Sequence, residues 1–232
     1  MRRLTMICLP YLWLVALFLV PFLIVFKISL SDIDLAIPPY TPRLDFNAGW
    51  QGFLRFWAAL DFENYVFLTS DDLYWKAYLS SLRIAFISTT LTLLIGYPIS
   101  YGIARANTEW RATLLMLVIL PFWTSFLIRV YAWMGILGTE GLLNQLLLAL
   151  GLIETPLTIL NTNWAVYIGI VYTYLPFMIL PIYASLEKLD NSLLEAAIDL
   201  GCSRLRAFWL ITMPLSKNGV VAGCFLVFIP AL

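Results

Sequence analysis

Long runs of apolar residues constrain this chain more than any other feature. Of its 232 residues, 62% are hydrophobic and only 12% are charged, which is about half the charged share of an ordinary soluble domain. Several runs approach or exceed the ~20 residues that an α-helix needs to cross ~30 Å of hydrocarbon. The chain is therefore predicted to be an all-α membrane protein, built as a polytopic transmembrane helical bundle.

Five apolar segments can be drawn along the chain. Four spans are predicted over residues 9–30, 77–104, 112–137 and 164–186, and a fifth apolar segment covers 220–232. At 1.5 Å per residue the fifth reaches only ~20 Å, so we expect it to be part of a truncated span. The first run contains Pro21, lacks a small-residue cleavage site and is closed by Lys27, which favours an uncleaved span over a signal peptide.

Basic residues lie in alternate connections between the predicted spans. With the N-terminus inside, the cytoplasmic segments hold Arg2, Arg3, Arg105, Arg111, Lys188, Arg204, Arg206 and Lys217. The loop over 138–163 has no Lys or Arg, and the loop over 31–76 has seven acidic residues against three basic ones. The positive-inside rule therefore predicts a cytoplasmic N-terminus, outer loops at 31–76 and 138–163, and a cytoplasmic segment at 187–219.

The residue types within the spans argue against several classes of membrane protein. The chain has no histidine, and Cys8, Cys202 and Cys224 are scattered without metal spacing, so we predict no catalytic residue and no metal site. The four complete spans also lack Asp and Glu, whereas a proton- or ion-coupled secondary transporter usually carries an ionisable residue there. A secondary transporter of this kind and a non-transporting membrane scaffold nevertheless remain two alternative functions for a chain of this composition.

The polar segment near 187–219 is predicted to form two short helices that meet at a glycine. Ser192 and Glu195 have the spacing of a capping box for the first helix, and Gly201 stands where a left-handed residue would end it. Ser203 is placed to cap the second helix. An apolar stripe is expected on that helix, formed by Leu205, Phe208, Trp209 and Met213.

The same segment resembles the EAA loop of ABC-importer permeases. The resemblance is carried by Glu195, Ala196, Ala197, Asp199 and Gly201, followed by Phe208 and Pro214. In that family the loop docks into a cytoplasmic ATPase, which implies that these seven residues couple the membrane domain to it.

Further stretches are similar to the permease subunits of bacterial polyamine (putrescine and spermidine) ABC importers. These stretches are residues 21–30, 37–40, 120–137 and 165–181. The resemblance implies a type I ABC importer permease fold in the bacterial inner membrane, with loop 31–76 in the periplasm. It also implies a second permease subunit, an ABC ATPase dimer that holds ATP and Mg²⁺, and a periplasmic polyamine-binding protein, but no nucleic-acid partner. Family members continue through a fifth and a sixth span.

Residues for a cation route can be proposed from their chemistry. Aromatic faces attract ammonium groups by ~0.5–2 kcal/mol without a permanent charge, which makes candidates of Trp123, Tyr131, Trp133, Tyr167, Tyr172 and Tyr174. Packing against lipid is the alternative for each of them. Arg129, deep in the third predicted span, would repel a polyamine, so a structural pair with a neighbouring subunit or a gating role is expected for it.

Overall fold

Helices account for nearly all the regular structure in the computed structural model, which describes residues 10–35, 37, 40–42 and 49–232. Among these residues, four helices are long and apolar enough to cross a membrane, or five if one bent pair forms a single span. This confirms the prediction of an all-α membrane protein. Arg2, Arg3, Cys8, Arg43, Asp45 and the Pro38-Pro39 pair lie outside the described residues.

The chain separates into two units, residues 1–77 and 78–232, each of which is described by itself. The first unit holds a helical segment from Pro10 to Ser29 that comprises a π-helical stretch η1 (Val15–Leu19) and α2 (Val20–Ser29). It continues through β1 (Asp32–Ile33), β2 (Tyr40–Thr41), α3 (Gly49–Ala58) and α4 (Glu63–Ser70). The two short strands pair antiparallel, with Asp32 opposite Thr41.

The predicted loop over 31–76 is tied to the end of the first span. The Nζ of Lys27 lies 4.3 Å from the ring centroid of Tyr40 and 5.2 Å from that of Phe56. The side-chain amide of Asn64 donates to the carbonyl oxygens of Ser29 and Ser31, at 3.2 and 3.1 Å. The described parts of this loop are therefore partly helical and fold back on the end of α2.

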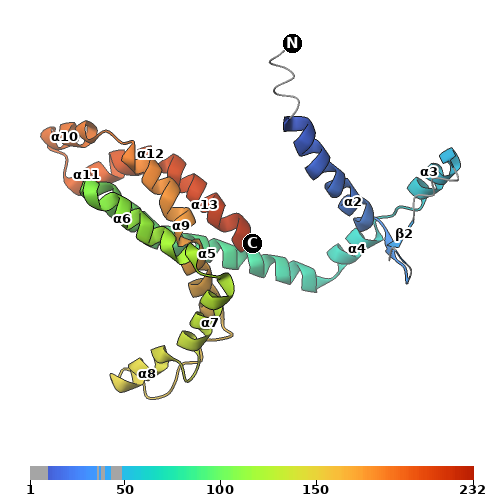
Figure 1. Ribbon diagram of the computed structural model, residues 1–232, viewed down its shortest axis with the longest axis horizontal. Helices are drawn as coiled ribbons and strands as arrows, with labels where there is room; N and C mark the ends of the chain where they lie inside the picture. The colour runs from blue at the N-terminus through green and yellow to red at the C-terminus, as the bar shows by residue number, and fades with distance from the viewer. Residues whose placement is uncertain (1–9, 36, 38–39, 43–48) are drawn as a thin grey trace, which may run out of the picture. The chain divides into compact units, whose positions relative to one another are not determined.

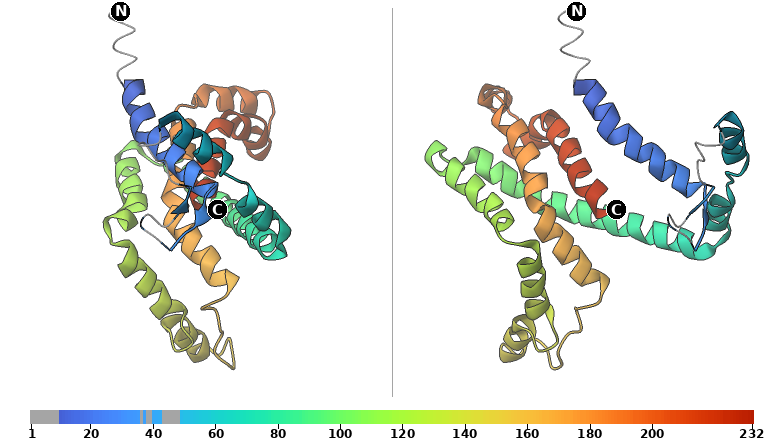
Figure 2. Two further views of the ribbon diagram at one scale, coloured as in Figure 1. Left: turned by 90° about the vertical axis from the view of Figure 1, so that its right-hand side faces the viewer. Right: turned by 45° about the vertical axis from the view of Figure 1, so that its right-hand side comes forward.

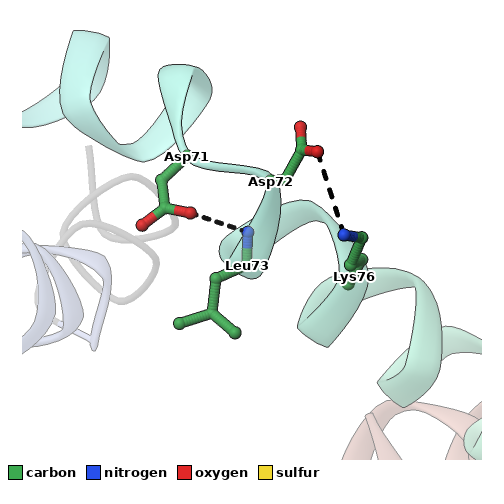
Figure 3. Close-up of polar contacts among 4 residues, drawn as sticks. All are labelled: Asp71, Asp72, Leu73 and Lys76. Atoms are coloured by element: carbon green, nitrogen blue, oxygen red, sulfur yellow. Dashed lines mark hydrogen bonds and ion pairs between the residues drawn. The ribbon is translucent and has the colours of Figure 1, made fainter.

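The longest helix, α5 (Asp72–Arg105), starts at an acidic cap (Figure 3). The carboxylate of Asp71, directly before the helix, accepts a hydrogen bond of 2.8 Å from the amide of Leu73. Asp72 and Lys76, one turn apart, form an exposed ion pair at 3.8 Å. The 34 residues of α5 extend ~51 Å at 1.5 Å each, so the helix is longer than the ~30 Å hydrocarbon layer.

The second unit continues from α5 through a series of shorter segments and one more long helix. In chain order these are α6 (Thr108–Ile119), η3 (Leu120–Trp123), α7 (Phe126–Leu137), α8 (Leu142–Ala149), α9 (Asn163–Glu187), α10 (Asn191–Asp199), α11 (Arg204–Ala207), η4 (Phe208–Thr212), α12 (Met213–Leu215) and α13 (Lys217–Ala231). Helices α12 and α13 meet at Ser216, and the bent pair 204–215 and 217–231 turns by 63°.

The third predicted span, over 112–137, is not one helix. Helix α6 stops at Ile119, a 3₁₀ turn follows, and Thr124 and Ser125 have ψ values of 145° and 140°, outside the helical range. Pro121 lacks the amide that would continue the ladder and crowds the preceding turn. The candidate span found here instead covers Phe126–Ala149. Pro98, Pro176 and Pro181, by contrast, stay inside continuous helices.

The core of the second unit lies where α5, α9 and α13 pack around Met178. Met178, Ile179 and Ile182 of α9 are fully buried, as is Val227 of α13. Figures 1 and 2 show α9 and α13 side by side. Gly219 of α13 permits this approach, because an added Cβ there would meet the carbonyl oxygen of Pro181 at 2.5 Å. Close contact through small residues is the usual way in which membrane helices associate.

Segments predicted to face the same side of the membrane gather at the same end of this unit. Helices α10 and α11 and the start of α6 lie at one end, and α8 lies at the other (Figures 1 and 2). Most large apolar side chains on α5, α7 and α13 remain exposed, among them Phe86, Ile128 and Phe225. Such surfaces suit contact with lipid or with another membrane subunit.

Candidate functional site

Helix α10 carries the first part of the predicted coupling segment, and its N-terminal cap differs from the prediction. The cap is Asp190, whose carboxylate accepts the amide hydrogen of Ser192 at 2.9 Å, whereas a capping box would have Ser192 as the cap. That hydrogen bond lowers the pKa of Asp190. The ionised cap is therefore fully favourable above the usual Asp pKa, and its contribution is lost as pH falls through the lowered value. Glu195 is left without a capping role.

The turn after α10 confirms the expectation for Gly201. Its φ is +84°, the left-handed conformation that glycine adopts without a Cβ penalty. The amide of Gly201 donates to the carbonyl of Ile198 at 2.8 Å, and that of Cys202 donates to the carbonyl of Ala197 at 2.9 Å. This pair of bonds is a Schellman motif, which fixes the angle at which the chain leaves the helix.

The second short helix begins where the sequence predicts, but its apolar residues face two directions. The hydroxyl of Ser203 accepts the amide hydrogen of Arg206 at 3.4 Å. Leu205 and Trp209 are 74% and 58% exposed, while Phe208 packs against the core around Met178. A π-helical turn starts at Phe208 and shifts the register, so the predicted single stripe does not form.

The residues assigned to coupling thus divide into an exposed group and an anchored one. Glu195, Ala196, Asp199, Gly201 and Pro214 are exposed, and Ala197 is half-buried. Glu195 forms no ion pair or hydrogen bond with the described part of the chain. Phe208 instead lies in edge-to-face contact with Tyr97 and Tyr101, with ring centroids 5.8 and 5.6 Å apart. The exposed group is available to a partner, and Phe208 joins it to the bundle.

A cavity of about 740 Å³ gathers part of the predicted cation route. Its wall includes Arg129 and Trp133 of α7, Tyr174 of α9, and two polar residues, Asn161 just before α9 and Asn163 at its start. No acidic residue lines it within the described part of the chain. The cavity combines aromatic faces, neutral amides and one fixed positive charge, which suits weak contact with a polar ligand rather than tight binding.

The guanidinium of Arg129 lacks partners in this wall. Its Nε and Nη1 atoms are buried and have no hydrogen-bond acceptor among the described residues. The group lies 5.5 Å from the ring centroid of Phe122 and 5.9 Å from that of Phe126. Ring faces compensate only a part of such desolvation.

The other predicted aromatic residues do not share this surface. Tyr172 packs edge-on against Trp133, with ring centroids 5.3 Å apart, and lines a different, smaller pocket. Tyr167 is buried against Trp164. Trp123 and Tyr131 are 78% and 69% exposed. The six aromatic residues therefore occupy several surfaces, and only Trp133 and Tyr174 of the set line the large cavity.

Sequence reasoning missed three residues that hold the coupling segment in place: Asp190, Tyr97 and Ser216. Asp190 precedes α10 directly, and an Asp at that place is a usual cap signal. The hydroxyls of Tyr97 and Ser216 lie 2.9 Å apart in the buried core. Because 119 positions separate them along the chain, no local pattern marks this pair.

Comparison with known proteins places this architecture in a family, although no family model matches the chain. The spermidine/putrescine transport system permease protein PotB of Haemophilus influenzae is 41% identical over 220 residues, covering 95% of this chain and 71% of that protein. PotB of Escherichia coli is 49% identical over 170 residues, covering 73% of this chain and 62% of that protein.

Solved structures have the same fold at low sequence identity. A bacterial ABC transporter involved in the import of alginate matches with a TM-score of 0.59 and 18% identity, over 91% of this chain and 67% of that chain. A bacterial alginate transporter in complex with its pentasaccharide-bound periplasmic protein matches with a TM-score of 0.52 and 21% identity, over 88% and 67%. The apolar helices and the bent final helix pair are consistent with a membrane-embedded permease. Because the similarity to PotB of Haemophilus influenzae covers 95% of this chain at 41% identity, the chain belongs to the family of permease subunits of spermidine/putrescine ABC transport systems.

Proposed function

We propose that this chain is one of two permease subunits of an ATP-driven polyamine importer, forms half of the translocation path and couples to a cytoplasmic ATPase. The single observation that carries the proposal is the relationship to PotB over 95% of the chain. The coupling segment and the cavity supply the parts that such a subunit needs. The chain itself performs no hydrolysis, because ATP and Mg²⁺ belong to the partner ATPase.

Contact with the ATPase is assigned to the exposed face of α10. Glu195 is exposed and unpaired within the described chain, and Ala196 beside it leaves room for a close approach. Asp190 at one end of the helix and Gly201 at the other hold it in a fixed direction. A short helix fixed at both ends can transmit a push, whereas a loose loop would absorb it.

The cargo path is assigned to the cavity lined by Trp133 and Tyr174. Their ring faces can attract an ammonium group by ~0.5–2 kcal/mol, and the amides of Asn161 and Asn163 can accept hydrogen bonds from it. The positive charge of Arg129 in the same wall opposes long residence of a polycation. Weak, brief contact suits a conduit that must release its cargo.

Arg129 is assigned a structural or gating role with the second permease subunit. Its buried, unpartnered nitrogens favour a second arrangement in which the other subunit supplies a hydrogen-bond acceptor.

The remaining partners are a periplasmic polyamine-binding protein and surrounding lipid. A related transporter has been solved with its substrate-bound periplasmic protein, which supports a binding protein as the donor of cargo. The N-terminus is placed on the cytoplasmic side of the inner membrane.

Site-specific cross-linking in native membranes tests the coupling assignment. Ala196→Cys, in a chain whose native cysteines are replaced by serine, should cross-link to an ATPase subunit. Leu150→Cys, which replaces another exposed residue, directly after α8 at the other end of the unit, is the matched control and should not. Cross-linking of neither position to an ATPase, with both proteins inserted and exposed, would contradict the proposal.

A further inference from the structure

The coupling segment is fastened to α5 by a buried polar contact. The hydroxyls of Tyr97 and Ser216 lie 2.9 Å apart, and Ser216 also donates to the carbonyl of Met213 at 3.1 Å. Since a serine hydroxyl has one hydrogen, this arrangement assigns Tyr97 as the donor to Ser216. Ser216 is fully buried and Tyr97 is 8% exposed, so water does not compete for the bond.

An aromatic contact fastens the other end of the same stretch. Phe208 meets the ring of Tyr97 at an interplanar angle of 88° and that of Tyr101 at 90°. Tyr97 and Tyr101 are four residues apart on α5 and therefore share one face of the helix. Edge-to-face pairs are specific in their geometry, so a shift of Phe208 has to be followed by α5 or has to break both contacts.

The stretch between these two contacts contains irregular backbone. A π-helical turn covers Phe208–Thr212, and the helix axis bends by 63° at Ser216. The hydroxyl of Thr212 is buried without a hydrogen-bond partner among the described residues. π-helical turns are rare and frequently lie at functional sites, and a buried hydroxyl without a partner adds no hydrogen bond that would hold this turn in place.

We propose that Tyr97, Tyr101, Phe208 and Ser216 form a latch that transfers movement of the coupling segment to α5. The inference rests on the proposed function, because it assumes that the partner ATPase moves α10. Tyr97 and Ser216 are positioning residues in this account: they touch neither cargo nor ATPase. Their bond keeps the bend at Ser216 in register with α5, so that displacement of α10 displaces the long helix rather than unwinding the π-helical turn.

The test uses the complete transporter, with this chain assembled with its second permease subunit, ATPase and binding protein. Tyr97→Phe and Ser216→Ala each remove the bond and leave the ring contacts of Phe208. We expect each to lower the number of polyamine molecules imported per ATP hydrolysed by about twofold to tenfold, the range that one net hydrogen bond allows. Ser216→Ala also removes the bond to the carbonyl of Met213, so the double variant should be no worse than Ser216→Ala alone.

Two matched controls separate the latch from general stability. Tyr183→Phe removes a comparable phenol bond, 2.7 Å to Glu187 within α9, from a side chain that is 7% exposed and packs in a different cluster from Phe208. Trp209→Leu removes the exposed ring next to Phe208, whereas Phe208→Leu removes the latch ring itself. Tyr183→Phe and Trp209→Leu should keep the wild-type ratio of import to hydrolysis, and Phe208→Leu should lower it.

The outcomes are distinguishable. If Tyr97→Phe and Ser216→Ala lower import and hydrolysis in parallel, so that their ratio is unchanged, the two residues only support the fold and the latch is refuted. Additive losses in the double variant would also refute it. A wild-type transporter that imports no polyamine with ATP would refute the proposed function instead, before any variant is compared.

Discussion

Replacing Gly201 should damage coupling through the backbone alone, without a steric clash. An added Cβ at this position meets nothing within 4 Å, yet φ is +84°. The left-handed conformation costs an ordinary L-residue about 1–2 kcal/mol. Gly201→Ala should therefore lower the equilibrium constant for the native turn roughly 5- to 30-fold. Gly201→Val should lower it further, because a β-branched residue resists positive φ more strongly.

Gly201→Asn is the control that isolates the backbone effect. Asparagine is larger than alanine but tolerates the left-handed region, so it should stay closest to wild type. Hydrogen exchange of the Gly201 and Cys202 amides, which donate to Ile198 and Ala197 at 2.8 and 2.9 Å, reports the opening of the turn directly. ATP-driven uptake reports its consequence. Exchange and uptake should both rank the variants as glycine, asparagine, alanine and valine.

Two results would refute this reasoning. If asparagine and valine were equally damaging, the size of a side chain facing the partner would matter, rather than φ. If valine left exchange and uptake unchanged, the left-handed turn would not be needed for coupling. Membrane insertion should be normal in all three variants, because Gly201 is exposed outside the spans.

Three further substitutions test other parts of the molecule. Glu195→Gln should lower substrate-stimulated ATPase activity severalfold without loosening α10, because Asp190 is the cap; wild-type uptake and stimulation would remove Glu195 from the contact. Gly219→Ala should destabilise the detergent-solubilised protein by about 1–3 kcal/mol through overpacking against Pro181, seen as a lower melting temperature. Gly102→Ala, whose added Cβ meets nothing within 4 Å, should not lower the melting temperature. Equal melting temperatures of the Gly219→Ala and Gly102→Ala variants would contradict the close packing at Gly219. Arg129→Leu should reduce co-purification of the second permease subunit, whereas normal assembly with slower cargo release would mean that its charge faces the cargo.

Composition and apolar run length were sufficient to predict the class of the fold. The bilayer interior requires apolar residues, and its thickness sets the length of a spanning helix. The turn at Gly201 could also be predicted from the sequence, because few residue types other than glycine adopt a positive φ. The cap of α10 was assigned wrongly because Asp190 and Ser192 are both good caps, and the short-range pattern with Glu195 favoured the second. In the structure the amide of Ser192 donates to the carboxylate of Asp190, which is therefore the cap.

The break at Pro121 shows why proline alone does not determine a kink. Pro98, Pro176 and Pro181 present the same local signal but remain inside continuous helices. The latch had no sequence signal at all, because Tyr97 and Ser216 meet only when α5 and α13 pack together. The positions of the aromatic residues depend on the same tertiary packing, so chemistry identified candidates but did not group them.

Uptake of labelled putrescine and spermidine into proteoliposomes tests the central claim most directly. The vesicles should contain this chain with its second permease subunit and ATPase, with ATP on the ATPase side and the binding protein on the other. We predict uptake that requires ATP hydrolysis and persists when a protonophore collapses the proton gradient. Uptake that continues without the ATPase but stops with the protonophore would contradict it and would make the protein an ion-coupled carrier.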